Sequence, residues 1–215
     1  MRQLILDIRS DAFPDFHNFL PGPNQEALAA LTQLSTSPSG ESVVYLWGEA
    51  GVGKSHLLQA WATRARAPYF AHGALPEPDV WHLAVDDVAQ LNADDQIRLF
   101  SLINAVREQG GHLIVAGNLP PNQLLVRADL ATRLAQGLVF RLLPLADADK
   151  AQALAIRAEA LGVNLPEDVI RHLLTHCRRD LPHLLTLVDG LDAFSLSRKR
   201  PVSLPLLKDM LAQGA

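Results

Sequence analysis

The sequence predicts an α/β fold in which a parallel, helix-covered five-stranded sheet is followed by a small all-α domain. Three observations support this prediction. From Val43 to Leu143, short apolar runs alternate with amphipathic stretches, which is typical of strands connected by helices. A glycine-rich turn at residues 48–55 directly follows the first apolar run. After Pro144 the strand pattern stops and only helical periodicity remains.

Periodicity, glycine and proline place the individual elements along the chain. The turn at residues 21–24 precedes the first helix, and Asp147 can cap the first helix of the C-terminal part, which Gly162 ends. The proline-rich segment between Arg66 and His82 is short, which suggests a trimmed core element. Strands are predicted at residues 43–47, 69–70, 82–85, 112–116 and 138–142. Helices are predicted at residues 25–35, 55–66, 94–109, 130–135, 147–161, 166–177, 181–196 and 204–212.

Composition narrows the class of protein. A chain of 215 residues with 48% hydrophobic content can bury one substantial core and a smaller satellite domain. Its net charge of −4 creates no field that attracts nucleic acid, so we expect no direct sequence-specific DNA binding. The single cysteine, Cys177, excludes an internal disulfide, and no apolar run has the length of a membrane span or of a signal peptide. We therefore expect a cytoplasmic protein with no membrane association.

The turn at residues 48–55 reads as a phosphate-binding P-loop. Its glycines let backbone N–H groups turn toward a polyphosphate, and the helix that follows directs its positive end at the anion. Lys54 would reach the β- and γ-phosphates, and the Ser55 hydroxyl would ligate Mg²⁺. We predict ADP or ATP with Mg²⁺ as ligands, against the alternative of a chance glycine-rich turn. The predicted nucleotide ligands are Gly48, Gly51, Gly53, Lys54 and Ser55.

Two later strands end in polar residues that suit such a loop. The strand at residues 82–85 ends in two carboxylates, of which Asp86 would hold the Mg²⁺ shell and Asp87 would polarise an attacking water. A plain strand-to-turn junction is the alternative. The strand at 112–116 leads to Asn118, which would act as a sensor near the γ-phosphate or simply cap the turn that follows.

Several basic residues have both a functional and an ordinary interpretation. Arg133 lies on the predicted short helix before the last strand, where a P-loop oligomer presents an arginine to its neighbour; the alternative is a solvated side chain. Arg178 and Arg179 would face the nucleotide from the tail or lie in solvent. His172 and His176 have the spacing of two zinc ligands, but the sequence supplies no further ligand nearby, so we expect ordinary histidines.

The order and spacing of these motifs resemble those of the DnaA-related AAA+ family, and within it the regulators that inactivate DnaA. The resemblance implies a P-loop AAA+ core with a parallel five-stranded sheet, followed by a small all-α lid domain. It divides the chain into a clamp-binding segment at residues 1–20, a nucleotide-binding core at 21–144 and a helical lid at 145–215. The segments that carry the resemblance are residues 19–24, 48–58, 86–87, 117–121, 129–134, 145–150 and 165–169.

The resemblance also implies a negative regulator of chromosomal replication initiation. Its nucleotide-bound form, tethered to the DNA sliding clamp (the beta subunit of DNA polymerase III), would stimulate hydrolysis of ATP bound to DnaA, with Arg133 as an arginine finger in trans. Gln3 would bind the rim of the clamp, and Leu4 and Leu6 would enter its apolar pocket. An ordinary frayed terminus is the alternative for this peptide. Assembly into a homo-oligomer is also compatible with the family.

Departures from the family pattern affect the expected activity. Pro182 occupies the position of the lid sensor arginine, for which Arg179 would have to substitute, so we expect weak or no intrinsic ATPase activity and a nucleotide that acts mainly as a switch. The chain ends at Ala215 without the DNA-binding domain of DnaA. The main alternative is a self-sufficient AAA+ ATPase of the helicase-loader type. A small-molecule kinase is disfavoured because the tail lacks an arginine cluster.

Overall fold

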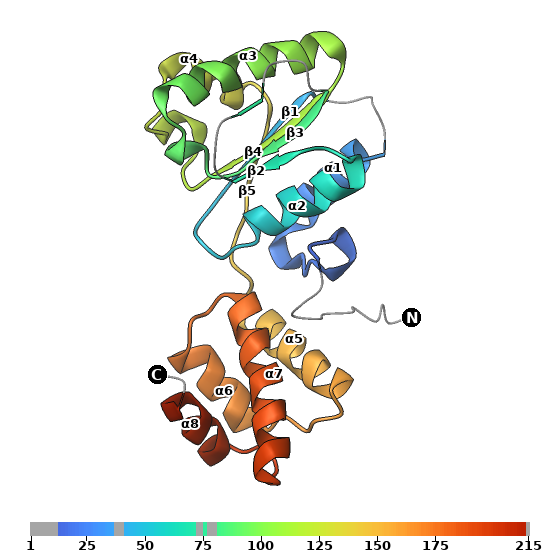
Figure 1. Ribbon diagram of the computed structural model, residues 1–215, viewed down its shortest axis with the longest axis vertical. Coiled ribbons are helices and arrows are strands. Elements are labelled where there is room, and N and C mark those ends of the chain that lie inside the picture. The colour runs from blue at the N-terminus through green and yellow to red at the C-terminus, as the bar shows by residue number, and fades with distance from the viewer. Residues whose placement is uncertain (1–12, 37–40, 72–74, 77–80, 214–215) are drawn as a thin grey trace. The chain divides into compact units, whose positions relative to one another are not determined.

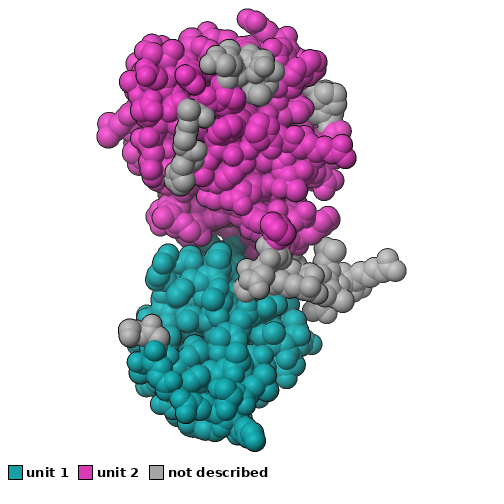
Figure 2. All heavy atoms as spheres, in the orientation of Figure 1, with its two compact units in different colours: residues 1–12, 145–215 teal, residues 13–144 magenta. Residues whose placement is uncertain are grey.

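The computed structural model describes residues 13–36, 41–71, 75–76 and 81–213. The described residues form two compact units, residues 13–144 and 145–213, which are coloured separately in Figure 2 and are treated one at a time below. In the part of the chain that the structure describes, none of the helices is long and apolar enough to cross a membrane. The predicted clamp-binding residues Gln3, Leu4 and Leu6 lie outside the described residues.

A parallel five-stranded sheet forms the centre of the unit at residues 13–144, as predicted (Figure 1). The strand order is β2-β3-β4-β1-β5, and every neighbouring pair is parallel. Parallel strands end at the same edge of a sheet, so the turns after β1, β3 and β4 are brought together. The strands are β1 (Val43–Trp47), β2 (Tyr69–Phe70), β3 (His82–Val85), β4 (His112–Gly117) and β5 (Leu138–Arg141).

Helices pack on both faces of this sheet because its central strands are apolar on both sides. On one face, Val44 and Leu46 pack with Trp61 of α2; on the other, Val43 and Tyr45 pack with residues of α3 and α4. We call these the α2 face and the α3 face. The helices are α1 (Gln25–Leu34), α2 (Lys54–Ala65), α3 (Ala93–Gln109) and α4 (Ala128–Ala135). Short 3-10 turns are η1 (Phe16–Asn18), η2 (Gly22–Asn24), η3 (Val88–Gln90) and η4 (Pro121–Gln123).

Helix ends follow the local chemistry of the sequence. The Asn92 side chain accepts a hydrogen bond from the Asp95 N–H at the start of α3, and Gly110 ends that helix with a φ of +72°. Helix α2 begins at Lys54, one residue earlier than predicted, directly after Gly53. The first turn of α2 is therefore part of the P-loop itself.

Residues at the beginning of the 13–144 unit pack into its core and hydrogen-bond to its last residues. Phe16 and Phe19, which lie in the segment predicted to be N-terminal to the core, are buried in the cluster on the α2 face. The buried Asn24 side chain donates to the Leu143 carbonyl at 2.9 Å and accepts from the Leu143 N–H at 2.8 Å. The Asn24 amide thus bonds both the N–H and the C=O of Leu143, as the backbone of a neighbouring strand would, although β5 has already ended at Arg141.

The unit at residues 145–213 is all-helical, as predicted for the tail. Apolar side chains from its helices form the interior, and Arg157 of α5 donates to the Asp189 carboxylate of α7 at 2.6 Å. The prediction that Asp147 caps α5 is wrong: the cap position is Ala146, and Asp147 is the first helical residue, its carboxylate paired with Arg179. The helices are α5 (Asp147–Ala160), α6 (Glu167–His176), α7 (Leu181–Arg198) and α8 (Leu204–Gln213).

The two histidines of α6 stack on each other. The ring centroids of His172 and His176 are 4.2 Å apart, which is a consequence of their i, i+4 spacing on one helix face. Among the described residues there is no group of three or more side chains that could hold a metal ion. Burial lowers the pKa of His172, and repulsion from the neighbouring His176 and Lys208 lowers it further.

Candidate functional site

The P-loop has two positions that only glycine can occupy. A Cβ on Gly48 would lie 2.4 Å from the Leu142 carbonyl oxygen, which belongs to the chain just after β5. Gly53 has a φ of +99°, and a Cβ there would lie 2.7 Å from the Phe19 ring. The loop therefore lies against the end of β5 at Gly48 and against the buried Phe19 ring at Gly53, with no room for a side chain at either position.

Lys54 lies over the loop from the first turn of α2. Its ammonium group donates to the Gly48 and Glu49 carbonyls, at 2.8 Å each, and the side chain is buried. Burial lowers the pKa of Lys54, and the negative charges of Asp86 and Asp87 oppose that change. A lysine in this position offers an anion a partly desolvated positive charge at the start of a helix, which suits a phosphate.

The two carboxylates after β3 have different environments. Asp86 is buried and accepts hydrogen bonds from the Tyr69 hydroxyl at 2.8 Å and from the Asp87 N–H at 2.9 Å. Asp87 is partly exposed, with a left-handed φ of +47°, and its carboxylate accepts a hydrogen bond from the Gln90 side chain. Aspartate tolerates this conformation better than most residues, and it turns the second carboxylate away from the strand.

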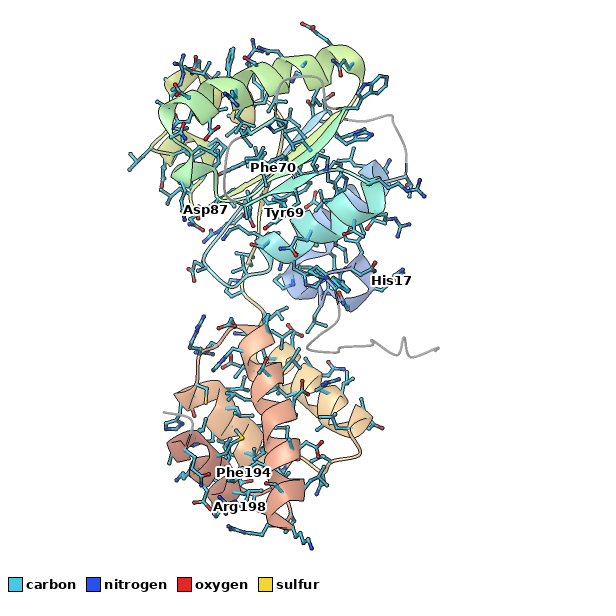
Figure 3. The ribbon with its side chains drawn as sticks, in the orientation of Figure 1. His17, Tyr69, Phe70, Asp87, Phe194 and Arg198 are labelled. Carbon is cyan, nitrogen blue, oxygen red and sulfur yellow. The ribbon has the colours of Figure 1, made fainter. Side chains whose placement is uncertain are left out.

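Tyr69 is a site residue that the sequence did not reveal. It lies on β2, its ring packs on the α2 face, and its hydroxyl is the group that donates to the Asp86 carboxylate. Burial raises the pKa of Tyr69. In Figure 3, Tyr69 and Asp87 lie at the same end of the sheet, close to the start of α2. The Tyr69 hydroxyl thus contacts Asp86, one of the two predicted Mg²⁺ ligands.

The predicted sensor lies on the strand next to the carboxylates. Strand β4 pairs with β3 along its length, and Asn118 follows β4 directly, with an exposed side chain. The turn after Asn118 is held by Tyr45, whose hydroxyl donates to the Leu119 carbonyl at 2.7 Å. Burial and the nearby Asp87 charge raise the pKa of Tyr45. A Cβ on Gly117 would lie 2.2 Å from the same hydroxyl, so a glycine is needed there.

A hollow of about 400 Å³ opens beside the carboxylates, and Lys54 is not one of the residues that line it. It is bounded by the end of β2, by Asp86 and Asp87, and by the start of α3, where Asp94 and Asp95 add negative charge. Arg98 also lines the hollow, but four carboxylates outnumber it, so the lining as a whole repels phosphate. A polyphosphate is therefore expected on the P-loop side of Asp86, at Lys54 and the first turn of α2.

The predicted arginine finger lies on the other face of the sheet from α2. Arg133 is on α4, and its guanidinium carbon is 5.6 Å from the centre of the Phe100 ring of α3. A cation over an aromatic face is held by electrostatic attraction and by packing. Because α3 and α4 share a cluster that is separate from the α2 cluster, Arg133 is not brought to this chain's own P-loop lysine.

The lid residues singled out in the sequence are engaged within their own unit. Arg179 pairs with Asp147, and the Arg178 guanidinium lies 3.3 Å from the Asp180 carboxylate. Pro182 is in the first turn of α7, where its missing N–H leaves no helical hydrogen bond unmade. A proline side chain has no hydrogen-bond donor to offer a phosphate, and the effect of this residue on nucleotide sensing stays a prediction.

Two known families match separate parts of the chain. The lid domain of Hda matches residues 147–211, and the bacterial DnaA ATPase domain matches residues 11–71. The first match coincides with the helical unit from α5 to α8, and the second covers α1, β1, the P-loop, α2 and β2.

Solved structures share the fold of the whole chain at low sequence identity. Domain III of the Thermotoga maritima replication initiation protein DnaA is 22% identical, with a TM-score of 0.78 over 94% of this chain and 97% of that one. AMPPCP-bound DnaA from Aquifex aeolicus is 20% identical, with a TM-score of 0.71 over 86% of this chain and 66% of that one. The Thermotoga maritima RuvB Holliday junction branch migration motor is 14% identical, with a TM-score of 0.71 over 98% and 73%.

At these identities the solved structures establish the AAA+ fold, while the family matches establish the relationship in sequence. The P-loop, the parallel sheet and the helical unit agree with both. The chain is therefore a DnaA/Hda-related AAA+ protein.

Proposed function

We propose that this chain is a DnaA-related replication factor that binds adenine nucleotide and restrains the initiation of chromosomal replication. In its nucleotide-bound form, tethered to the sliding clamp, it stimulates hydrolysis of ATP bound to DnaA by supplying Arg133 in trans. The match of residues 147–211 to the Hda lid supports the regulatory branch of the family. The AMPPCP in the Aquifex aeolicus DnaA structure supports an adenine nucleotide as the ligand class.

The nucleotide site of this proposal is the P-loop edge of the sheet. The loop N–H groups and Lys54 bind the phosphates, and Asn118 lies near the terminal phosphate. Ser55 and Asp86 are the residues that would hold Mg²⁺, because both carry the oxygen ligands that this ion prefers. When bound, the ion would neutralise phosphate charge. Asp87 is the candidate to orient a water, since its carboxylate is partly exposed.

The observation that carries the action in trans is the position of Arg133. Its guanidinium is held over Phe100 on the α3 face, while the start of the nucleotide-binding helix is on the α2 face. An arginine placed there serves a nucleotide on a neighbouring molecule better than the chain's own. Arginine fingers in trans contribute about 10³–10⁵ in rate by neutralising transition-state charge.

The chain's own nucleotide has a structural role in this proposal. Pro182 cannot contact phosphate and Arg179 is paired with Asp147, so intrinsic hydrolysis is weak. The bound nucleotide orders the P-loop and stabilises one arrangement of the protein for docking to DnaA. Gln3, Leu4 and Leu6 tether the complex to the clamp, which concentrates it where replication is under way.

Hydrolysis of DnaA-bound ATP in the presence of DNA-loaded clamp tests the proposal. Wild type should stimulate hydrolysis, and Gln3→Ala and Arg133→Ala should each lose most of that stimulation. Arg64→Ala is the matched control, because Arg64 is exposed on the last turn of α2 and should stimulate like wild type. Full stimulation by both Gln3→Ala and Arg133→Ala would refute the adaptor mechanism.

A self-sufficient ATPase of the helicase-loader type is the second candidate. The intact set of Lys54, Asp86 and Asp87, with Asp87 supported by Gln90, favours it. ATP turnover by the isolated chain distinguishes the two candidates. Rapid turnover without DnaA or clamp, lost in Asp87→Asn, would support this second function.

A further inference from the structure

A histidine on the P-loop helix α2 contacts the start of the 13–144 unit, residues 13–19, which we call the entry segment. The His56 Nε2 atom lies 2.9 Å from the Asp15 carbonyl oxygen, although the two residues are 41 positions apart in the sequence. A carbonyl oxygen can only accept a hydrogen bond, so Nε2 carries a proton and donates it. Burial lowers the pKa of His56, which favours the neutral ring with this single N–H. The bond is therefore a directed contact from α2 to the entry segment.

The entry segment also touches the P-loop through an aromatic ring. The centroids of the Phe19 and His56 rings are 5.5 Å apart, and a Cβ on Gly53 would lie 2.7 Å from the Phe19 ring. Phe19 is buried in the cluster on the α2 face, so the ring has a fixed place. The entry segment thus contacts both the glycine turn of the P-loop and the first turn of α2.

Hydrogen bonds within the entry segment fold it into one turn without attaching it to the core. The Asn18 side chain accepts from the Asp15 N–H at 2.9 Å and donates to the Phe13 carbonyl at 3.0 Å. Between the entry segment and the other described residues, the structure shows a single hydrogen bond, the one from His56. Without that donor, only the packing of apolar rings would hold the segment against α2.

Phosphate binding acts on the same atoms that hold the entry segment. In the proposed site the loop N–H groups and Lys54 bind the phosphates, and Gly53 and His56 flank Lys54 on either side. A ligand that orders these residues also restricts the positions of the Phe19 ring and of the His56 donor. By linkage, the nucleotide binds more tightly when the segment is held, by the same factor by which the nucleotide favours the held segment.

We propose that His56 is a positioning residue that couples nucleotide occupancy of the P-loop to the order of the entry segment. This coupling rests on the proposed nucleotide binding. In the sequence, the entry segment lies between the predicted clamp-binding residues and α1. Occupancy of the P-loop therefore fixes the part of the core from which the clamp-binding peptide departs.

The test is backbone hydrogen exchange of the full chain, measured by NMR with and without saturating ADP. In wild type, ADP should slow exchange of the His17 and Asn18 amides by at least about fivefold. His56→Phe keeps a ring against Phe19 but removes the donor, so the slowing should fall below about twofold. Its ADP affinity, measured by calorimetry, should drop by about two- to tenfold, which is the effect of one hydrogen bond. Thermal unfolding of each variant is recorded alongside.

Two amide variants isolate the donor. The glutamine amide nitrogen reaches the position of the histidine Nε2 atom, whereas the shorter asparagine reaches only that of Nδ1. His56→Gln should therefore keep the effect of ADP on the entry segment, and His56→Asn should lose it. His17→Gln is the matched control, because His17 is exposed in the same segment (Figure 3) and its replacement should leave the response to ADP as in wild type.

The remaining outcomes separate this coupling from the function on which it rests. If wild type does not bind ADP, nucleotide binding itself fails, and the coupling fails with it. If ADP binds but leaves exchange in the entry segment unchanged, or slows it equally in wild type and His56→Phe, nucleotide binding stands and the role of His56 is refuted. Equal responses of His56→Gln and His56→Asn would also overturn the proposal, because the donor at Nε2 would then not be the cause.

Discussion

Gly53→Ala is expected to destabilise the protein by about 2–5 kcal/mol, and the structure separates this cost into two parts. The residue has a φ of +99°, where a Cβ costs about 1–2 kcal/mol. The new methyl group would also lie 2.7 Å from the Phe19 ring, and overpacking of a filled site costs about 1–3 kcal/mol more. The ring cannot move away easily, because Phe19 is buried in the cluster on the α2 face.

Gly110→Ala is the matched control for the first part of this cost. Gly110 also has a left-handed φ, +72°, but a Cβ there meets nothing within 4 Å. Urea unfolding followed by circular dichroism should give a loss of about 1–2 kcal/mol for Gly110→Ala and a clearly larger loss for Gly53→Ala. Equal losses in the two variants would show that contact with Phe19 does not constrain the loop.

Three further predictions concern buried charge and its partners. Burial lowers the pKa of His112, so below a pH of about 6.5 the unfolded chain binds a proton at this residue that the folded chain does not bind. The free energy of unfolding should therefore keep its full value above that pH and decrease as the pH falls below it. His112→Leu should weaken that fall, as followed by thermal unfolding between pH 5 and 8. Asp189→Asn weakens the ion pair with Arg157 and should cost about 1–3 kcal/mol in urea unfolding. Lys54→Ala should reduce ADP affinity by roughly ten- to a hundredfold in calorimetry, since a charge-assisted contact to phosphate is lost.

Each of these predictions has a control or a contradicting result. For His112, the same slope of stability against pH in wild type and in the leucine variant would contradict it. For Asp189, the comparison is Asp209→Asn, whose partner Arg200 is half exposed and whose loss should cost less than about 1 kcal/mol. For Lys54, unchanged ADP affinity would exclude the P-loop as the phosphate site.

The strands and the P-loop could be predicted because their signals are local. Strand β1 has the predicted bounds, and α2 begins within one residue of its predicted start. Apolar runs of strand length and a glycine-rich turn need no knowledge of distant residues. The pairing of β3 with β4 places Asn118 on the strand beside Asp86. The functional roles given to Asn118 and Arg133 stay predictions.

The contacts that complete the site could not be read from local patterns. Tyr69 meets Asp86 because β2 pairs with β3 in one particular register, with Tyr69 opposite Ala84. Phe19 and Gly53 are far apart in the sequence but in contact in the fold. Gly53 is therefore required both by its positive φ and by the Phe19 ring that packs against it. The sequence offered only a weak signal for Tyr69: an aromatic residue with a hydroxyl group, on a strand beside the one that leads to Asp86 and Asp87.

The double hydrogen bond between Asn24 and Leu143 determines where the chain leaves the core. Strand β5 ends at Arg141, yet Leu143 is still fixed, because the Asn24 amide supplies both a donor and an acceptor to its backbone. The next residue, Pro144, has a φ restricted by its ring. Asn24 therefore holds the backbone of residues 13–144 in place up to the residue that precedes Pro144.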